Sequence, residues 1–223
     1  MSRTFIIILL AVLAGAAVLP AQTARTIQAL GNASLSVQPD QAQLTVSVST
    51  DGATAEQAAQ QNATQTTAVI SALQQVMGSS GSIQTIGYSE SPRYSTGMNP
   101  SIIGYTAANT VQVTTYDLTL PGALIDAASQ SGASTVGGLT FGLRNPDPTK
   151  QQALTAAAQQ ALAHASAIAA GLGAKAGAVV SAQESAATSP VVLPVASSAS
   201  TPIQTGYVTV TASVTVTVRL QSP

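Results

Sequence analysis

The chain has no cysteine, no tryptophan and a single histidine. Without cysteine it can form no disulfide and offers no thiolate ligand or cysteine nucleophile. One histidine excludes a metal site built from several imidazoles. We therefore expect neither a metal site nor a bound cofactor.

Charge is also scarce. Charged residues make up 7% of the chain, with seven Lys and Arg and a formal net charge of −1. A globular protein usually has about 25% charged residues, and a nucleic-acid-binding protein needs clustered cations to displace counterions from phosphates. This composition excludes nucleic acid as a partner. It does not indicate disorder, because 45% of the residues are hydrophobic.

The N-terminus has the pattern of a secretory signal peptide. Arg3 precedes an apolar run from Phe5 to Leu19, and small residues follow at Ala21. We expect residues 1–21 to be removed after Ala21, with cleavage after Ala17 as the alternative and an uncleaved anchor as the other possibility. No second apolar run is long enough to cross a membrane. The mature chain, residues 22–223, is therefore expected in the periplasm, with the outer membrane as one possible place of association.

Hydrophobic periodicity predicts three helices. The first spans 54–77 with Thr54 as its cap, the second runs from Pro121 to near Gly132, and the third runs from Asp147 to about Leu172. The spacing of apolar residues in the third helix predicts one buried stripe along it. That stripe consists of Leu154, Ala158, Ala161, Ala165, Ile168 and Leu172.

Alternating residues predict the strands. Two strands are expected within 26–51, an antiparallel pair within 82–118, one strand at 135–143, one starting at Val179, and a last one at 207–218. Valines alternate with threonine and serine in the last strand, so its valine face should be buried. Residues 185–204 are rich in Ser, Ala and Pro and are expected to form a flexible loop.

These elements predict an α+β fold of mainly antiparallel sheets packed by helices. Their order, βαββ followed by αβαββ, suggests two related halves, with possible sub-halves at 26–118 and 119–221. The whole mature chain is long enough to form one large domain or two small ones.

An ordered set of short motifs resembles the SIMPL-domain family, a bacterial branch of which is exported to the periplasm. No single motif is specific, but together they span nearly all of 26–221. They include Gly31-Asn32-Ala33-Ser34, Ser91-Pro92-Arg93-Tyr94, Gly104-Tyr105-Thr106-Ala107-Ala108-Asn109 and Gly137-Gly138-Leu139-Thr140-Phe141. Two features depart from the family: Ala33 stands where a second glycine is common, and the helices carry Gln and Thr instead of many charges.

The resemblance implies an α+β fold and no established catalysis. Named members include a periplasmic immunogenic protein and an oxidative-stress-defence protein, so it also implies a link to envelope or oxidative stress. In at least one relative it implies assembly into a large ring or channel-like oligomer. The scarcity of charge here puts any salt-bridged assembly contact in doubt.

A tyrosine-rich segment is the candidate interaction surface, since tyrosine is rigid, amphipathic and enriched at interfaces. The alternative is aromatic pairing across two strands. The candidate interface residues are Tyr88, Arg93, Tyr94, Tyr105 and Tyr116. His164 is either a general base or a surface histidine, and no motif supplies it with a nucleophile or an acid partner.

Three functions remain open from the sequence. The first is a non-enzymatic envelope protein that acts by self-assembly, as a homo-oligomer, or by binding other envelope proteins. The second is an enzyme, such as a hydrolase of envelope polymers, although no motif selects a pair of carboxylates. The third is a small-molecule binder in a cleft between the halves. The first agrees best with the absence of a catalytic motif.

Overall fold

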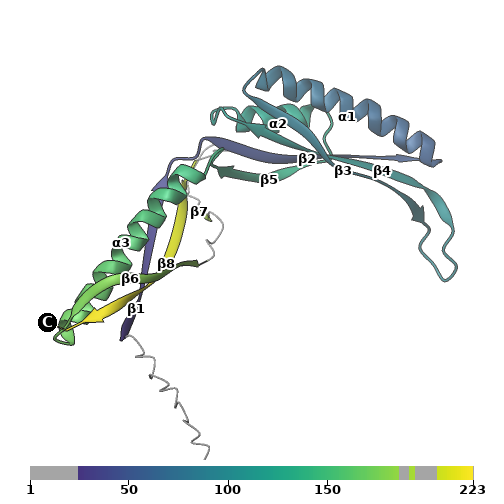
Figure 1. Ribbon diagram of the computed structural model, residues 1–223. Helices are drawn as coiled ribbons and strands as arrows, with labels where there is room; N and C mark the ends of the chain where they lie inside the picture. Colours follow the sequence, from purple (N-terminus) through teal and green to yellow (C-terminus); the bar gives the residue numbers. More distant parts are fainter. Residues whose placement is uncertain (1–24, 186–190, 194–204, 223) are drawn as a thin grey trace, which may run out of the picture.

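The computed structural model describes residues 25–185, 191–193 and 205–222. Within them the chain forms three helices and eight strands, arranged as two antiparallel sheets that each pack against helices (Figure 1). The expected α+β class with antiparallel sheets is confirmed. The expected signal peptide at 1–21 and most of the expected loop at 185–204 lie outside the described residues.

The first sheet has the strand order β1-β8-β6. These strands are β1 (Thr26–Val37), β8 (Tyr207–Gln221) and β6 (Lys175–Ser185), and the short β7 (Val191–Leu193) also pairs with β8. The valine face of β8 is buried, as its alternation predicts, and lies in the middle of the sheet. Helix α3 (Asp147–Gly171) packs on this face, mainly over β1 and β8.

The second sheet has the strand order β3-β4-β2-β5. Its strands are β3 (Gly81–Tyr94), β4 (Ile102–Thr115), β2 (Gln41–Gly52) and β5 (Thr135–Gly142). Helices α1 (Ala55–Met77) and α2 (Pro121–Gln130) cover one face. Their apolar side chains form a second core with the inward residues of β2 and β4.

The two sheets are not built from consecutive halves of the chain. Strand β1 pairs with β8 near the C-terminus, and β5 belongs to the same sheet as β2. The sub-halves 26–118 and 119–221 therefore do not coincide with the sheets. Pro39-Asp40 does not close a hairpin: it carries the chain from one sheet to the other, where the Asp40 carboxylate accepts a 2.6 Å hydrogen bond from the Arg144 amide.

Helix α1 starts and packs as its sequence predicts. The Thr54 hydroxyl accepts a hydrogen bond from the Gln57 amide, and Gly78 ends the helix with a positive φ of 56°. Asn62 is fully buried, where its amide donates to the carbonyls of Val48 and Ala107 at 2.9 and 3.0 Å. It therefore ties the helix to two strands of the sheet below.

The expected buried stripe of α3 is wrong in part. The buried residues recur every fourth position and are all alanines, whereas Ile168 and Leu172 are 45% and 65% exposed. The reason is how closely the helix approaches the sheet: a Cβ on Gly31 of β1 would lie 2.0 Å from the Ala157 carbonyl oxygen. Only alanine fits at the line of contact, so the larger side chains lie on its flanks. The buried residues are Ala153, Ala157, Ala161, Ala165 and Ala169.

Two parts of the expected loop at 185–204 are strand residues in the structure. Ser185 is the last residue of β6, and residues 191–193 form β7. The other residues of that range lie outside the description.

Candidate interaction surfaces

A two-stranded arm extends beyond the second sheet. Strand β2 ends at Gly52, which pairs with Tyr105, whereas β3 and β4 continue to a loop closed between Ser95 and Ser101 (Figure 1). We call residues 86–106 the arm; residues 86–92 lie along the edge of the sheet, and only residues 93–104 extend beyond β2. Its exposed large apolar side chains are Ile86, Tyr88, Tyr94, Met98, Ile102 and Ile103.

The arm is exposed because of where β3 lies. It is the edge strand of its sheet, and every β3 residue from Gln84 onward is exposed. The register shifts between Thr85 and Gly87, which leaves Ile86 as an extra residue in the ladder, 54% exposed. A β-bulge of this kind bends and twists the strand. Apolar side chains therefore lie on a strand that also has a free edge.

Tyr88 and Tyr105 lie on the α1 side of the arm. Tyr105 shares the strand face of the buried Ala107, and Tyr88 pairs with Asn109, the next residue but one on that face. The Tyr88 hydroxyl donates to a Glu90 carboxylate oxygen at 2.6 Å. This hydrogen bond, helped by the negative charge of Glu90, raises the pKa of Tyr88 above its ordinary value. Tyr88 is therefore held in its neutral form, with half of its surface exposed.

Arg93 lies on the opposite face of the arm. Its guanidinium forms an ion pair with Asp51 at the end of β2, and the Thr106 hydroxyl donates to the other oxygen of the same carboxylate at 2.6 Å. Both ion-pair partners are about half exposed, so the pair contributes little to stability. It does hold the charge of Arg93 against the base of the arm.

Tyr116 is not part of the arm. It follows the other end of β4, where the Arg144 guanidinium lies 3.9 Å from the centre of its ring. This cation–π contact joins two connecting segments near Asp40. The structure thus brings four of the five candidate interface residues together and separates the fifth.

Sequence reasoning overlooked the aliphatic residues of the arm. Ile86, Met98, Ile102 and Ile103 are all at least half exposed. The available signal was Ile102-Ile103, two adjacent apolar residues beside a Gly, Asn and Pro-containing loop. Because neighbours in a strand point to opposite faces, one sheet face cannot bury both.

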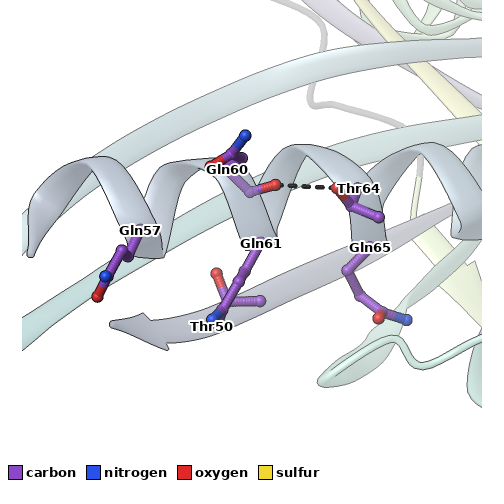
Figure 2. Close-up of a pocket in the computed structure, with 6 residues that line it drawn as sticks. All are labelled: Thr50, Gln57, Gln60, Gln61, Thr64 and Gln65. Atoms are coloured by element: carbon purple, nitrogen blue, oxygen red, sulfur yellow. Dashed lines mark hydrogen bonds between the residues drawn. The ribbon is translucent and has the colours of Figure 1, made fainter. Parts of the chain in front are cut away.

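A shallow groove runs along the outer side of α1 (Figure 2). Gln57, Gln61 and Gln65 are directed to the same side of the helix, above Thr50 of β2, and Gln60 and Thr64 complete the lining. Gln65 is already engaged, since its amide donates to the Ser131 carbonyl at 2.6 Å. The groove offers amides and hydroxyls but no ionisable group, so it supplies neither an acid nor a base for catalysis.

His164 acts as a contact between α3 and β1. Its Nδ1 lies 2.8 Å from the Leu30 carbonyl oxygen, so this nitrogen carries the hydrogen and donates it. One turn earlier, the Gln160 side chain accepts a 2.6 Å hydrogen bond from the Asn32 amide. The pair satisfies two backbone groups of β1 that β8 does not reach.

The described residues contain no group of three or more His, Cys, Asp or Glu side chains placed to hold a metal ion. Among these residues there is also no helix with the length and apolar character needed to cross a membrane. Asp117 accepts hydrogen bonds from the hydroxyl and amide of Thr119, which lower the pKa of its carboxyl. These bonds form a local turn after β4.

Comparison with protein families identifies the family of this chain. The family model for SIMPL, described as a protein of unknown function (DUF541), matches residues 27–218. No curated protein matches the chain.

Proposed function

Because the chain belongs to the SIMPL family, we propose that it is an exported, non-enzymatic envelope protein that works in the periplasm as a homo-oligomer. The observation that carries the proposal is the arm. It combines a free strand edge with exposed apolar side chains, and such a combination favours pairing with another chain.

The assembly contact is the free edge of β3 together with Tyr88 and Tyr105. A strand from a second copy would continue the sheet there. Tyr88 of β3 would pack against it, and Tyr105 of β4 lies one strand further in on the same face. Of the nearest charged side chains, Arg93 is paired with Asp51, whereas Glu90 accepts a hydrogen bond from Tyr88 and keeps its charge. Few charges therefore stand in the way of a second copy, and the contact should be insensitive to salt.

Sedimentation velocity of the mature protein at low and high salt tests this assembly. We expect the wild type to be an oligomer at both salt concentrations. Tyr88→Ala and Tyr105→Ala should weaken it, because truncated aromatic residues lose the most contact. Tyr116→Ala is the matched control, since it removes an exposed tyrosine outside the arm.

Two results would overturn the assembly proposal. One is a wild-type monomer at every concentration. The other is dissociation by Tyr116→Ala to the same extent as by the arm variants. An oligomer that falls apart in salt would contradict the neutral contact proposed for it.

Export is tested separately by mass spectrometry of the protein recovered from the periplasm. The apolar run that follows Arg3 predicts a mature chain that begins at Gln22, or at Val18 if cleavage follows Ala17. Recovery of the chain with Met1 intact in the cytosolic fraction would contradict export.

A further inference from the structure

The outermost part of the arm is uncharged, and four large apolar or aromatic side chains are exposed on it. We call residues 94–104 the tip; it contains no Asp, Glu, Lys or Arg. Met98 at its end is fully exposed, and Tyr94 is 56% exposed. Ile102 and Ile103 are 51% and 58% exposed. The register shifts between Arg93 and Tyr94, which leaves Ile103 as an extra residue in the ladder.

The tip does not suit a stable protein interface of its own, because it is small. It has 11 residues, whereas a stable protein interface takes about 20–30 residues from each side. An apolar medium that surrounds the tip would bury Met98 and both isoleucines together.

We propose that the tip inserts into the headgroup and upper acyl region of a lipid surface and attaches the protein to it peripherally. Tyr94 pairs with Ile102 and so lies at the same level of the tip, and an amphipathic aromatic residue is favoured at a membrane interface. The nearest cation, Arg93, is paired with Asp51. The attraction is therefore apolar and does not depend on anionic lipid.

The length of the arm fits the depth to which interfacial elements enter a lipid surface. Strand β4 runs three residues beyond the last pair with β2, from Tyr105 out to Ile102, or about 10 Å at 3.3 Å per residue. Interfacial elements enter by about 5–10 Å. Backbone polar groups must be hydrogen-bonded in that region. Two bonds across the base of the loop meet this requirement in part: the Ser95 amide donates to the Ser101 carbonyl at 2.8 Å, and the Ser101 amide donates to the Ser95 hydroxyl at 3.0 Å.

The chain itself permits a direct test, because it contains no tryptophan. Met98→Trp places a single fluorescent reporter at the end of the tip. The protein is used without residues 1–21, so that the N-terminal apolar run cannot bind lipid and all described elements remain. We expect its emission to shift to the blue on addition of phosphatidylethanolamine–phosphatidylcholine vesicles and to be quenched by brominated acyl chains. Leu172→Trp at the end of α3, a position that is 65% exposed, is the control that should not respond.

Flotation with the same vesicles measures the contribution of the isoleucines. Ile102→Ser and Ile103→Ser should each lower vesicle binding about tenfold, the expected effect of losing one partly buried aliphatic side chain. Leu172→Ser should leave binding unchanged. Circular dichroism before flotation confirms that each variant is folded.

Several results would overturn the proposal: absence of wild-type binding to any vesicle, binding that requires anionic lipid and disappears in high salt, or equal losses for Leu172→Ser. Dissociation of an oligomer by Ile103→Ser without vesicles would show that the tip meets protein. The lipid contact does not depend on self-assembly, since Tyr88→Ala should dissociate an oligomer and leave the Met98→Trp response of the same protein in place.

Discussion

Gly31→Ala should destabilise the protein strongly, although it adds only one methyl group. Gly31 lies in β1 directly under α3, and its added Cβ would be 2.0 Å from the Ala157 carbonyl oxygen and 2.4 Å from the Ala161 amide nitrogen. Both are backbone atoms of a helix, so no side-chain rotation relieves the contact. Overpacking a core costs about 1–3 kcal/mol, and a contact with backbone belongs at the upper end.

The net loss in the free energy of unfolding is smaller than the cost of the clash alone. Replacing glycine by alanine in a strand restricts the unfolded chain and favours folding by about 0.4–1 kcal/mol. The expected net loss is therefore about 2 kcal/mol, which lowers Tm by roughly 4–8 °C for a domain of this size. Thermal unfolding followed by circular dichroism measures it. Gly137→Ala in β5 is the control, because nothing lies within 4 Å of its added Cβ.

A double variant tests whether the clash is with the backbone of α3. Adding Ala157→Gly to Gly31→Ala should not restore stability, because the contact involves the carbonyl oxygen of residue 157 and not its side chain. Equal Tm values for the variants at 31 and 137 would refute the close approach of α3 to β1. Recovery in the double variant would refute the assignment of the clash to backbone.

Three further results are expected. Asn62→Ala should cost about 1–3 kcal/mol in the free energy of unfolding for each of the two buried strand carbonyls it leaves unpaired, measured by urea denaturation, and an unchanged midpoint would contradict this. Val214→Asp should unfold the protein, whereas Thr215→Asp on the open face of β8 should be tolerated better, and equal thermal losses would contradict the assigned faces. Glu90→Gln should lower the pKa of Tyr88 toward its ordinary value, as followed by NMR. In the wild type this hydrogen bond contributes to stability fully below the unfolded-state pKa of Tyr88, and the contribution is lost as pH rises through the higher folded-state pKa.

Local patterns were sufficient for most elements but not for the packing of α3. The alternation in β8 and the Thr54 cap of α1 predict what the structure has, because both depend on neighbours in sequence. Burial in α3 depends on Gly31, which lies more than 100 residues away. Hydrophobicity alone favours Ile168 and Leu172 for the contact, yet the distance between helix and sheet admits only alanine.

The candidate interface was predictable only in part, for a related reason. The tyrosines of the arm form a cluster in sequence, but Tyr116 belongs to that cluster only along the chain. Its ring packs against Arg144, which no local pattern connects to it. Ile102 and Ile103 look like ordinary strand residues in the sequence. The end of β2 at Gly52 means that no third strand from the described part of the chain lies beside them.

One edge strand in each of the two sheets is protected differently, and this bears on the self-association proposed for so weakly charged a chain. Charged side chains are the common protection of an edge strand, and this chain has few. On β1 the protection comes from neutral groups instead: Gln160 and His164 of α3 bond to the Asn32 amide and the Leu30 carbonyl. These bonds occupy backbone groups that another strand would need. No described helix covers β3 beyond its first residues, and its exposed side chains include Ile86, Tyr88 and Tyr94. Of these two edges, that of β3 is therefore the more open, and it is where the proposed self-association is expected.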